Sequence, residues 1–545
     1  MRKYRNLIIA VFGISIFAFS FKADNYFEIT KNLDVFSSIF KELNAYYVDD
    51  FKNDELIEKG VNAMLKSLDP YTNYISEDEI GAFRTQTTGK YGGIGSIIRK
   101  IEDHIVIAEP YFGFPAQKAG LIAGDRIIAV DGKSMKGKTT TELSETLRGT
   151  PGTEVTIEIF RPIKKEELKF TLVREEVKVG AVPYYGMLNE NVGYISLRSF
   201  TDNCSKELTA ALNELESENE LESLVFDLRG NPGGLLHEAV NVSNLFIDKG
   251  KLVVSTKGKV KEWERNYKTK NTPFNTKIPL VVLTNKSSAS ASEIVAGVLQ
   301  DYDRGVVIGQ NTFGKGLVQT TRNLSYNTKL KITTAKYYVP SGRSIQSVNY
   351  KNGKKSEVVA DSLKAKFKTN KGRLVYDGGG VAPDIAIEKI PMHSITADIL
   401  RKQLAFEYVN QFVSKNTSIA SPREFELSDA NYDEFVAYLK SEDFDYVSSS
   451  EKELTALIEQ AEKEGYYDDI ETQLTSLKGN IKHDKNQDLV KHKKEIKEYL
   501  ERQIVKRYYY QKGAVEAGLD EDKEIKKALE ILSDQARYNK LLLVQ

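Results

Sequence analysis

The chain has 545 residues, 41% hydrophobic and 10% aromatic, enough to build cores in about three or four domains and too many for a largely disordered protein. Lysine plus arginine and aspartate plus glutamate both number 77, so a chain-wide basic field for nucleic acid is absent. Cys204 is the single cysteine, which excludes an intrachain disulfide and a cysteine-rich zinc site. The five histidines are scattered, so a metalloenzyme based on histidine or cysteine is not expected.

The N-terminus has the pattern of an export signal. Basic residues precede an apolar run over 7–21, which is shorter than the roughly 20 residues of a spanning helix. Phe21 and Lys22 spoil the small-residue cleavage pattern before Ala23, so an uncleaved membrane anchor stays open as the alternative. We predict residues 1–24 to be a signal peptide or membrane anchor. The bulk of the chain is then exported, to the periplasm or cell envelope.

The next two segments differ in the spacing of their apolar residues. Over 25–88, apolar residues recur at three- and four-residue steps, which predicts an N-terminal helical region. Over 89–179, short alternating strands at 104–107 and 126–130 are separated by glycine turns, and 141–147 can form a helix. This second segment is typical of a small module with strands and one or two helices.

Strands and helices alternate between 180 and 392, and this rhythm predicts an α/β core. The expected strands are 192–197, 224–228, 280–283 and 306–308, and the expected helices are 204–215, 236–246 and 290–300. The remaining segment, 393–545, is charged and helical. We interpret it as a solvated helical domain with no visible catalytic signal.

A run of serines at 287, 288, 290 and 292 opens one predicted helix directly after a strand. Backbone amides are free at a helix start and the helix dipole favours negative charge there. Both properties suit a serine nucleophile whose attack creates an oxyanion. A serine followed three residues later by Glu293 is equally a helix capping box, which needs no catalysis.

A serine nucleophile needs a base, and the chain lacks both a Gly-x-Ser-x-Gly elbow and a histidine near the serine run. A lysine whose pKa is lowered by burial can take the serine proton. Lys315 is the candidate, because flanking glycines let the backbone approach a site closely. The stretch 309–315 also fits a phosphate loop, but Gly316 lacks the hydroxyl that binds magnesium and a strand follows, so nucleotide binding is disfavoured.

A third element is the loop that ends the strand over 224–228. Gly233 and Gly234 expose backbone amides there, and such a nest can bind an oxyanion. The alternative is an ordinary turn, in which Asp227 and Arg229 form a local ion pair and brace the loop.

Three motifs in this order resemble the carboxy-terminal processing peptidases, also called tail-specific proteases, over about residues 30–390. The motifs are Asp227–Leu235, Ser288–Glu293 and Phe313–Gly316 followed by Gln319. The resemblance implies that Ser290 is the nucleophile, Lys315 the general base, and Gln319 the residue that orients the lysine. It places the oxyanion amides on Ala291 and Gly233.

The strand-rich module resembles a PDZ domain in its segments 92–95, 116–125 and 127–132. Such domains add an extended peptide to a sheet edge and hold its terminal carboxylate in backbone amides. The resemblance implies that Gly93, Ile94 and Gly95 form the carboxylate loop.

The predicted fold class is an α/β protease core, a mixed sheet with flanking helices, with an inserted α+β PDZ domain, N-terminal helices and a C-terminal all-helical region. The predicted domains are 1–24, 25–88, PDZ 89–179, protease 180–392 and helical 393–545. The predicted function is an exported serine endopeptidase that needs no metal or organic cofactor. It binds protein or peptide substrates with free C-termini and cuts near that end. The C-terminal helices could serve an adaptor or self-association, and an inactive peptide-binding scaffold is the alternative function.

Overall fold

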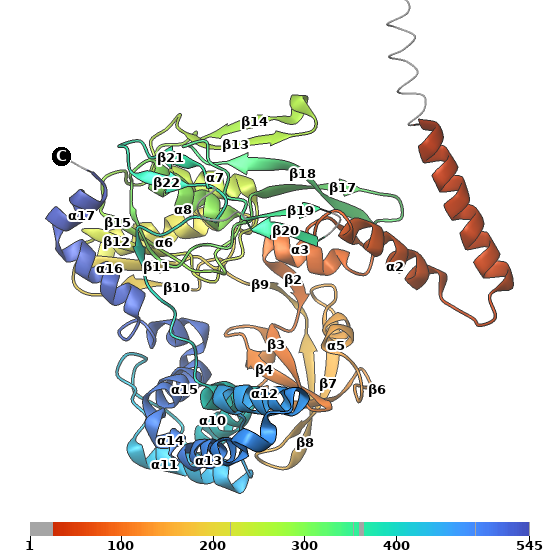
Figure 1. Cartoon of the computed structure of the whole chain (residues 1–545), viewed down its shortest axis with the longest axis vertical. Coiled ribbons are helices and arrows are strands. Elements are labelled where there is room, and N and C mark those ends of the chain that lie inside the picture. Colours follow the sequence, from red (N-terminus) through yellow and green to blue (C-terminus); the bar gives the residue numbers. More distant parts are fainter. Residues whose placement is uncertain (1–25, 219, 352–353, 359–363, 486, 544–545) are drawn as a thin grey trace, which may run out of the picture. The chain divides into compact units, whose positions relative to one another are not determined.

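The protein is described from a computed structural model, which covers every residue except 1–25, 219, 352–353, 359–363, 486 and 544–545 (Figure 1). The predicted signal peptide or anchor, 1–24, therefore lies outside the described residues. Within the described part, no helix has the length and apolar character needed to cross a membrane. The chain forms two units, Met1–Lys66 and Ser67–Gln545.

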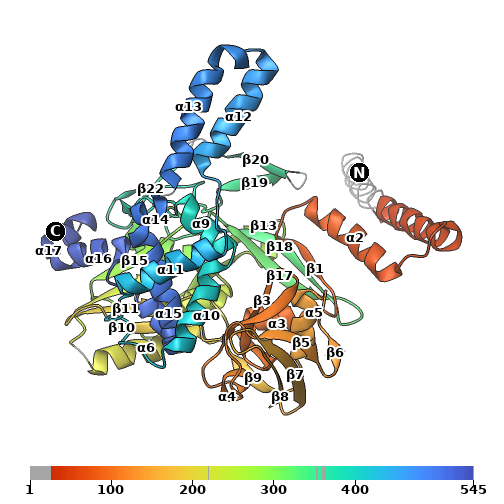
Figure 2. The same ribbon diagram turned by 90° about the horizontal axis from the view of Figure 1, so that it is seen from below.

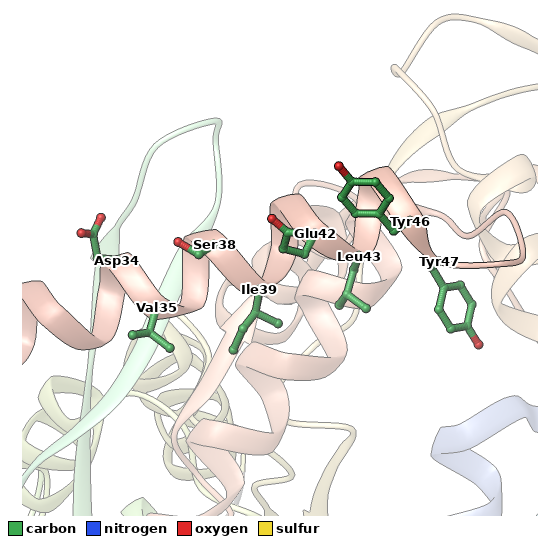
Figure 3. A pocket seen from close by; sticks show the side chains of 8 residues that line it. All are labelled: Asp34, Val35, Ser38, Ile39, Glu42, Leu43, Tyr46 and Tyr47. Carbon is green, nitrogen blue, oxygen red and sulfur yellow. The ribbon is translucent and has the colours of Figure 1, made fainter.

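The described part of the first unit consists of a helix over 26–46 and the helix α2 (Asn53–Lys66). The helical prediction for this segment is confirmed. In Figure 3, Val35 and Ile39 point to the same side of the first helix, as the three- and four-residue spacing requires. These two side chains are 51% and 54% exposed, so the apolar face is not covered within this unit.

The core of the second unit is a six-stranded sheet in the order β10-β11-β12-β15-β16-β23. Its strands are β10 (Tyr184–Met187), β11 (Val192–Ser196), β12 (Ser223–Asp227), β15 (Leu280–Thr284), β16 (Val306–Gly309) and β23 (Ile385–Ala386). All neighbours are parallel except β10, which runs antiparallel to β11. The four predicted core strands occur within one residue of their predicted ends, because continuous apolar runs are typical of sheets buried on both faces.

Helices cover both faces of this sheet. One face packs against α6 (Cys204–Glu218), α7 (Leu236–Asn244) and α8 (Ala291–Asp301), the three helices expected from the sequence. The other face packs against α16 (Lys523–Ser533) and α17 (Gln535–Leu541), which come from the far C-terminus (Figure 1). The last two helices are therefore part of the hydrophobic core of the sheet.

A second sheet has the order β1-β18-β13-β14, and β17 pairs with β18. Its strands are β1 (Asn73–Ile75), β13 (Leu252–Gly258), β14 (Arg265–Lys268), β17 (Leu317–Asn323) and β18 (Lys329–Tyr338). Around it lie α3 (Ile80–Thr88), the short helix η1 (Lys261–Trp263), and the hairpins β19 (Val348–Lys351) with β20 (Lys354–Val358) and β21 (Lys366–Lys368) with β22 (Leu374–Tyr376). The strand β1 was not predicted, since its segment was expected to be helical.

The inserted module consists of a sheet in the order β3-β4-β5-β7-β8, with β6 beside β5. Its elements are β3 (Ser96–Ile101), β4 (His104–Pro110), α4 (Pro115–Lys118), β5 (Arg126–Val130), β6 (Lys133–Ser134), α5 (Thr140–Leu147), β7 (Glu154–Arg161) and β8 (Glu166–Val173). At its two ends, β2 (Lys90–Gly93) pairs with β9 (Glu175–Lys178). An insertion whose ends pair in this way enters and leaves the rest of the chain at one place.

The C-terminal region is helical, as predicted, and can be followed in Figure 2. Its helices before α16 are α9 (Ser394–Arg401), α10 (Leu404–Lys415), α11 (Asp429–Ser441), α12 (Ser449–Glu464), α13 (Tyr467–Lys485), α14 (Asp488–Lys491) and α15 (Lys493–Glu516). This region contacts the inserted module through Lys506, whose ammonium lies 2.6 Å from the buried Glu109 carboxylate. Arg99 also donates to Gln403 at 2.8 Å.

Candidate active site

Ser290 lies at the junction between β15 and α8, where it is the N-cap of the helix. Its backbone has φ 55° and ψ −110°, a conformation that is rare for a residue other than glycine. The Ser290 N–H donates to the Glu293 carboxylate at 2.8 Å, and the Tyr337 hydroxyl donates to the Ser290 carbonyl at 3.2 Å. The surrounding contacts thus hold a strained serine, as is common where a side chain must be presented to a site.

Two other serines of the run, Ser288 and Ser292, have structural partners. Ser288 is fully buried, and its hydroxyl donates to the Leu228 carbonyl at 2.8 Å. Ser292 is fully buried as well, and its hydroxyl donates to the Asn231 carbonyl at 2.9 Å. Ser290, by contrast, is half-buried and lines a cavity. Ser290 is therefore the serine of these three whose hydroxyl is available to a substrate.

Glu293 links the serine to the loop that carries the candidate base. One carboxylate oxygen accepts from the Thr312 hydroxyl and the Gly314 N–H, both at 2.6 Å. The other accepts the N–H of Ser290 and of Lys315, both at 2.8 Å. Burial raises the pKa of Glu293, while these four hydrogen bonds act in the opposite direction. The carboxylate therefore holds the backbone of Ser290 and the backbone of the Lys315 loop close to each other.

Lys315 lies in the loop between β16 and β17, and its ammonium is 4.4 Å from the centre of the Tyr71 ring. Burial lowers the pKa of Lys315 to about 8, and the positive charge of Lys331 also lowers it. The carboxylates of Glu293 and Asp69 raise this pKa by smaller amounts. A lysine in this setting is neutral in a large fraction of molecules at mildly alkaline pH, as a general base must be.

Tyr71 is held beside Lys315 by the turn that begins at Asp69. The Asp69 carboxylate accepts the N–H of Tyr71 at 2.8 Å and that of Thr72 at 2.9 Å. It also accepts the Thr333 hydroxyl at 3.3 Å, and this hydroxyl in turn accepts from the Gln319 amide at 3.1 Å. The hydrogen bond of Gln319 therefore goes to Thr333, and an orienting contact from Gln319 to the lysine stays a prediction.

The glycine loop lies directly against the serine. A Cβ atom on Gly233 would come within 2.6 Å of the Ala289 carbonyl oxygen and 2.9 Å of the Ser290 Cβ, so only glycine fits there. The Gly233 N–H donates to the Asn231 side-chain oxygen at 2.9 Å. Among the hydrogen bonds of the described residues, none engages the N–H of Ala291 or of Gly234. These two amides are available for an oxyanion.

The base of this loop is anchored by a buried ionic network. Arg229 pairs with Asp227, at 2.7 Å, and with Asp522, the N-cap of α16, also at 2.7 Å. The Tyr194 hydroxyl donates to Asp227 at 2.7 Å. The pairing with Arg229 lowers the pKa of Asp227 against the effect of its burial. The ion pair between Asp227 and Arg229, which belonged to the alternative interpretation of this loop as an ordinary turn, is present. Its extension to the C-terminal helix was not predicted.

The cavity at this site has a volume of about 280 Å³. It brings together all five residues that the sequence predicted for catalysis: Ser290, Lys315, Gln319, Gly233 and Ala291. Lys331 and Tyr337 line it too.

The predicted carboxylate loop of the PDZ-like module lines a separate cavity of about 220 Å³, through Gly93 and Ile94. Gly95 has φ 72°, and a Cβ there would come within 2.4 Å of the Phe114 Cβ, which explains the glycine. Arg148 lines the same cavity and stacks on the Tyr91 ring at 5.1 Å. The loop and a cationic side chain thus face one groove.

Metal ligands are sparse in the described part of the chain. Asp202, His237 and Glu238 have side-chain ligand atoms within 4.8 Å of one another. The Glu238 carboxylate already accepts the Ser205 N–H at 2.8 Å and the Cys204 thiol at 3.3 Å. We assign no metal role to this group.

The sequence did not predict four residues that surround the catalytic candidates. They are Glu293, which links the Ser290 and Lys315 backbones, and Asp69, Tyr71 and Tyr337. The sequence identified Glu293 as a helix-capping residue. The available signal was its place three residues after Ser290, at the N3 position of the helix. The other three carry no local signal, because their partners lie far away in the sequence.

Comparison with known proteins agrees with this geometry. Residues 191–353 match the family "Peptidase family S41", 106–161 match "PDZ domain", and 395–532 match "Probable PDZ-protease, C-terminal helical domain". The "Carboxy-terminal-processing protease" of Bartonella bacilliformis is 38% identical over 354 residues, 64% of this chain and 81% of the relative. The chain belongs to the carboxy-terminal processing protease family, a family of serine peptidases.

The chain is also similar to a second bacterial protease and to a solved protease structure. A Staphylococcus aureus protein named "Probable CtpA-like serine protease" is 37% identical over 335 residues, covering 61% of this chain and 66% of the relative. Among solved structures, a photosystem II D1 C-terminal processing protease is 28% identical over 64% of this chain and 86% of that chain, with a TM-score of 0.35. The predicted fold class, with its PDZ domain, is confirmed by the matches to the two family models and by the structure.

Proposed function

We propose that this processing protease is exported and cleaves proteins near their carboxy termini with a Ser290–Lys315 dyad. The observation that carries the proposal is the contrast within the serine run. Ser288 and Ser292 have buried hydroxyls bonded to carbonyls, while Ser290 faces a cavity shared with a lysine of lowered pKa.

In the first step, neutral Lys315 accepts the proton of the Ser290 hydroxyl, and the serine oxygen attacks the peptide carbonyl carbon. The amides of Ala291 and Gly234, which make no hydrogen bond among the described residues, stabilise the resulting oxyanion. The carbon–nitrogen bond then breaks, and the leaving amine takes the proton from Lys315. An acyl-enzyme on Ser290 remains.

In the second step, a water molecule gives a proton to Lys315, and the hydroxide attacks the ester carbonyl. The bond to the serine oxygen breaks, and this oxygen takes back the proton from the lysine. The site returns to its starting state, and the product carries a new carboxylic acid that loses its proton to solvent water. The cycle uses groups of the chain and water.

The PDZ domain is proposed to bind the terminal carboxylate of the substrate at Gly93 to Gly95. Backbone amides of such a loop bind a carboxylate, and Arg148 adds a positive charge to the groove. Export rests on the apolar N-terminal run.

The test compares Lys315→Ala with Lys315→Arg in the full chain, using an unfolded protein substrate. Arginine keeps the charge but does not deprotonate in proteins, so both variants should lose turnover equally. Substantial cleavage by Lys315→Arg would remove the lysine from the role of base. A wild-type protein that binds free C-terminal peptides without cleaving any would favour the inactive scaffold.

A further inference from the structure

Charge is strongly segregated along this chain, although its net charge is zero. Of the 77 basic and 77 acidic residues, 24 basic and 7 acidic residues fall within 251–376. This segment carries a formal charge of +17, and the rest of the chain carries −17. A segment of one sign within a neutral protein creates a directed electrostatic field.

Seven of these 24 basic residues lie on the second sheet, in the strands β13, β14, β17 and β18, which lie together in Figure 1. These four strands contain no aspartate or glutamate. Their basic residues are Lys257, Arg265, Lys268, Arg322, Lys329, Lys331 and Lys336. Among the ion pairs of the described residues, none involves any of these seven. We call this set the basic sheet.

The basic sheet is continuous with the catalytic cavity. On β17, residues 317–319 and Thr321 line that cavity, and Thr321 is paired with Lys331 of β18, which also lines it. Arg322 is the next residue outward and is exposed. Lys329 is paired with Asn323 at the outer end of the two strands. Positive charge therefore runs from the cavity outward along β17 and β18.

The strand β17 also has a free edge. Among the described strands its single partner is β18, so the opposite edge can accept an extended peptide. A substrate that added to this edge with its scissile bond at Ser290 would continue along the strand toward Arg322. Its side chains there would meet the Arg322 guanidinium, which stacks on the Trp263 ring at 4.9 Å and makes no ion pair among the described residues.

We propose that the basic sheet selects acidic substrates, namely unfolded segments rich in aspartate and glutamate next to the cleavage site. The proposal rests on the proposed protease function and adds the substrate class to it. Carboxylates on the substrate would pair with Arg322 and Lys329, and the negative remainder of the chain would steer them toward this surface.

The experiment uses the full chain and a set of internally quenched peptides with one common C-terminus and one common cleavage segment. They differ in a short adjoining segment that contains either Asp and Glu or their isosteres Asn and Gln. We expect kcat/KM to be about tenfold higher for the acidic peptide at low salt. The ratio should approach one as ionic strength rises from about 0.01 M to about 1 M, where the Debye length falls from about 30 Å to about 3 Å.

The variant R322Q/K329Q/K336Q removes three positive charges from the basic sheet, and it should bring the acidic-to-neutral ratio close to one at low salt. The control K452Q/K463Q/K478Q removes three charges from the exposed faces of α12 and α13 and should keep the wild-type ratio. Equal kcat/KM for the two peptides with wild-type protein would overturn the proposal. Failure of the wild type to cleave either peptide faster than Ser290→Ala would instead contradict the proposed function.

An anionic membrane is the competing partner for such a surface. Sedimentation with phosphatidylcholine vesicles, with and without phosphatidylglycerol, separates the two. Binding to the anionic vesicles that the triple variant abolishes, together with an unchanged peptide ratio, would assign the surface to lipid and overturn the substrate proposal. We expect the opposite pattern.

Discussion

The Glu293 carboxylate accepts the backbone N–H of Lys315 at 2.8 Å, across 22 positions of sequence. The same carboxylate accepts the N–H of Ser290 at 2.8 Å, so one buried side chain sets the distance between the two loops. A buried acceptor that satisfies several N–H donors is costly to replace, because each donor loses its partner. Glu293 is thus a positioning residue for the proposed dyad.

Glu293→Gln should reduce kcat at least about tenfold, because a buried hydrogen bond to a charged group contributes about 1.5–3 kcal/mol. Glutamine has one acceptor oxygen where glutamate has two. Its NH₂ group, a donor, would therefore face either the N–H groups of Ser290 and Lys315 or the N–H group of Gly314, which are donors as well. Steady-state kinetics of the purified variant measure the effect. Glu459→Gln, on the exposed surface of α12, is the matched control and should behave as wild type. Wild-type kcat for Glu293→Gln would show that this link is dispensable.

Activity should rise with pH through about 8, the pKa of Lys315. Burial lowers this pKa first and the charge of Lys331 second, so Lys331→Gln should raise it and move the midpoint of the kcat/KM profile to higher pH. Lys478→Gln, far along α13, is the control for an equal change of net charge. A midpoint that stays in place or moves to lower pH in Lys331→Gln would contradict the electrostatic coupling between the two lysines.

The C-terminal helices should be needed for the stability of the protease sheet. Ile531 of α16 is fully buried against the strands of the core, so Ile531→Ala should lower the free energy of unfolding by about 2–5 kcal/mol. Urea denaturation, monitored by far-ultraviolet circular dichroism, measures this loss. The control is Leu457→Ala on α12, where the side chain is 50% exposed and the change should stay within about 0.5 kcal/mol. An equal effect of the two substitutions would mean that α16 does not contribute to the core.

Four of the six strands of the central sheet were predictable because they are short, mainly apolar runs such as Leu280–Thr284. The edge strands β10 and β23 were not predicted. The strand β1 was missed because it has three residues and depends on pairing with β18, a partner more than 250 positions away. The segment of α16 was predicted as a helix from its charged helical pattern. Its position on the sheet is decided by tertiary contacts, such as Tyr538 of α17 hydrogen-bonded to Leu280.

The five catalytic candidates came from sequence motifs, and the structure brings them to one cavity. The residues that tune and hold them could not be found in the same way. Tyr71 acts through a ring face that meets Lys315, and Asp69 acts through Thr333. Such contacts depend on the path of the chain in space, which no local spacing encodes.

The most direct test of the account is the cleavage rate of the single variants Ser290→Ala, Ser288→Ala and Ser292→Ala on one unfolded substrate. Ser290→Ala should lose all measurable turnover while its circular dichroism spectrum and melting temperature stay close to wild type, because its side chain faces a cavity. The other two should retain turnover and lose stability, because each removes a buried hydrogen bond to a carbonyl. Full turnover by Ser290→Ala, or its loss in a well-folded Ser292→Ala, would contradict the assignment of the nucleophile.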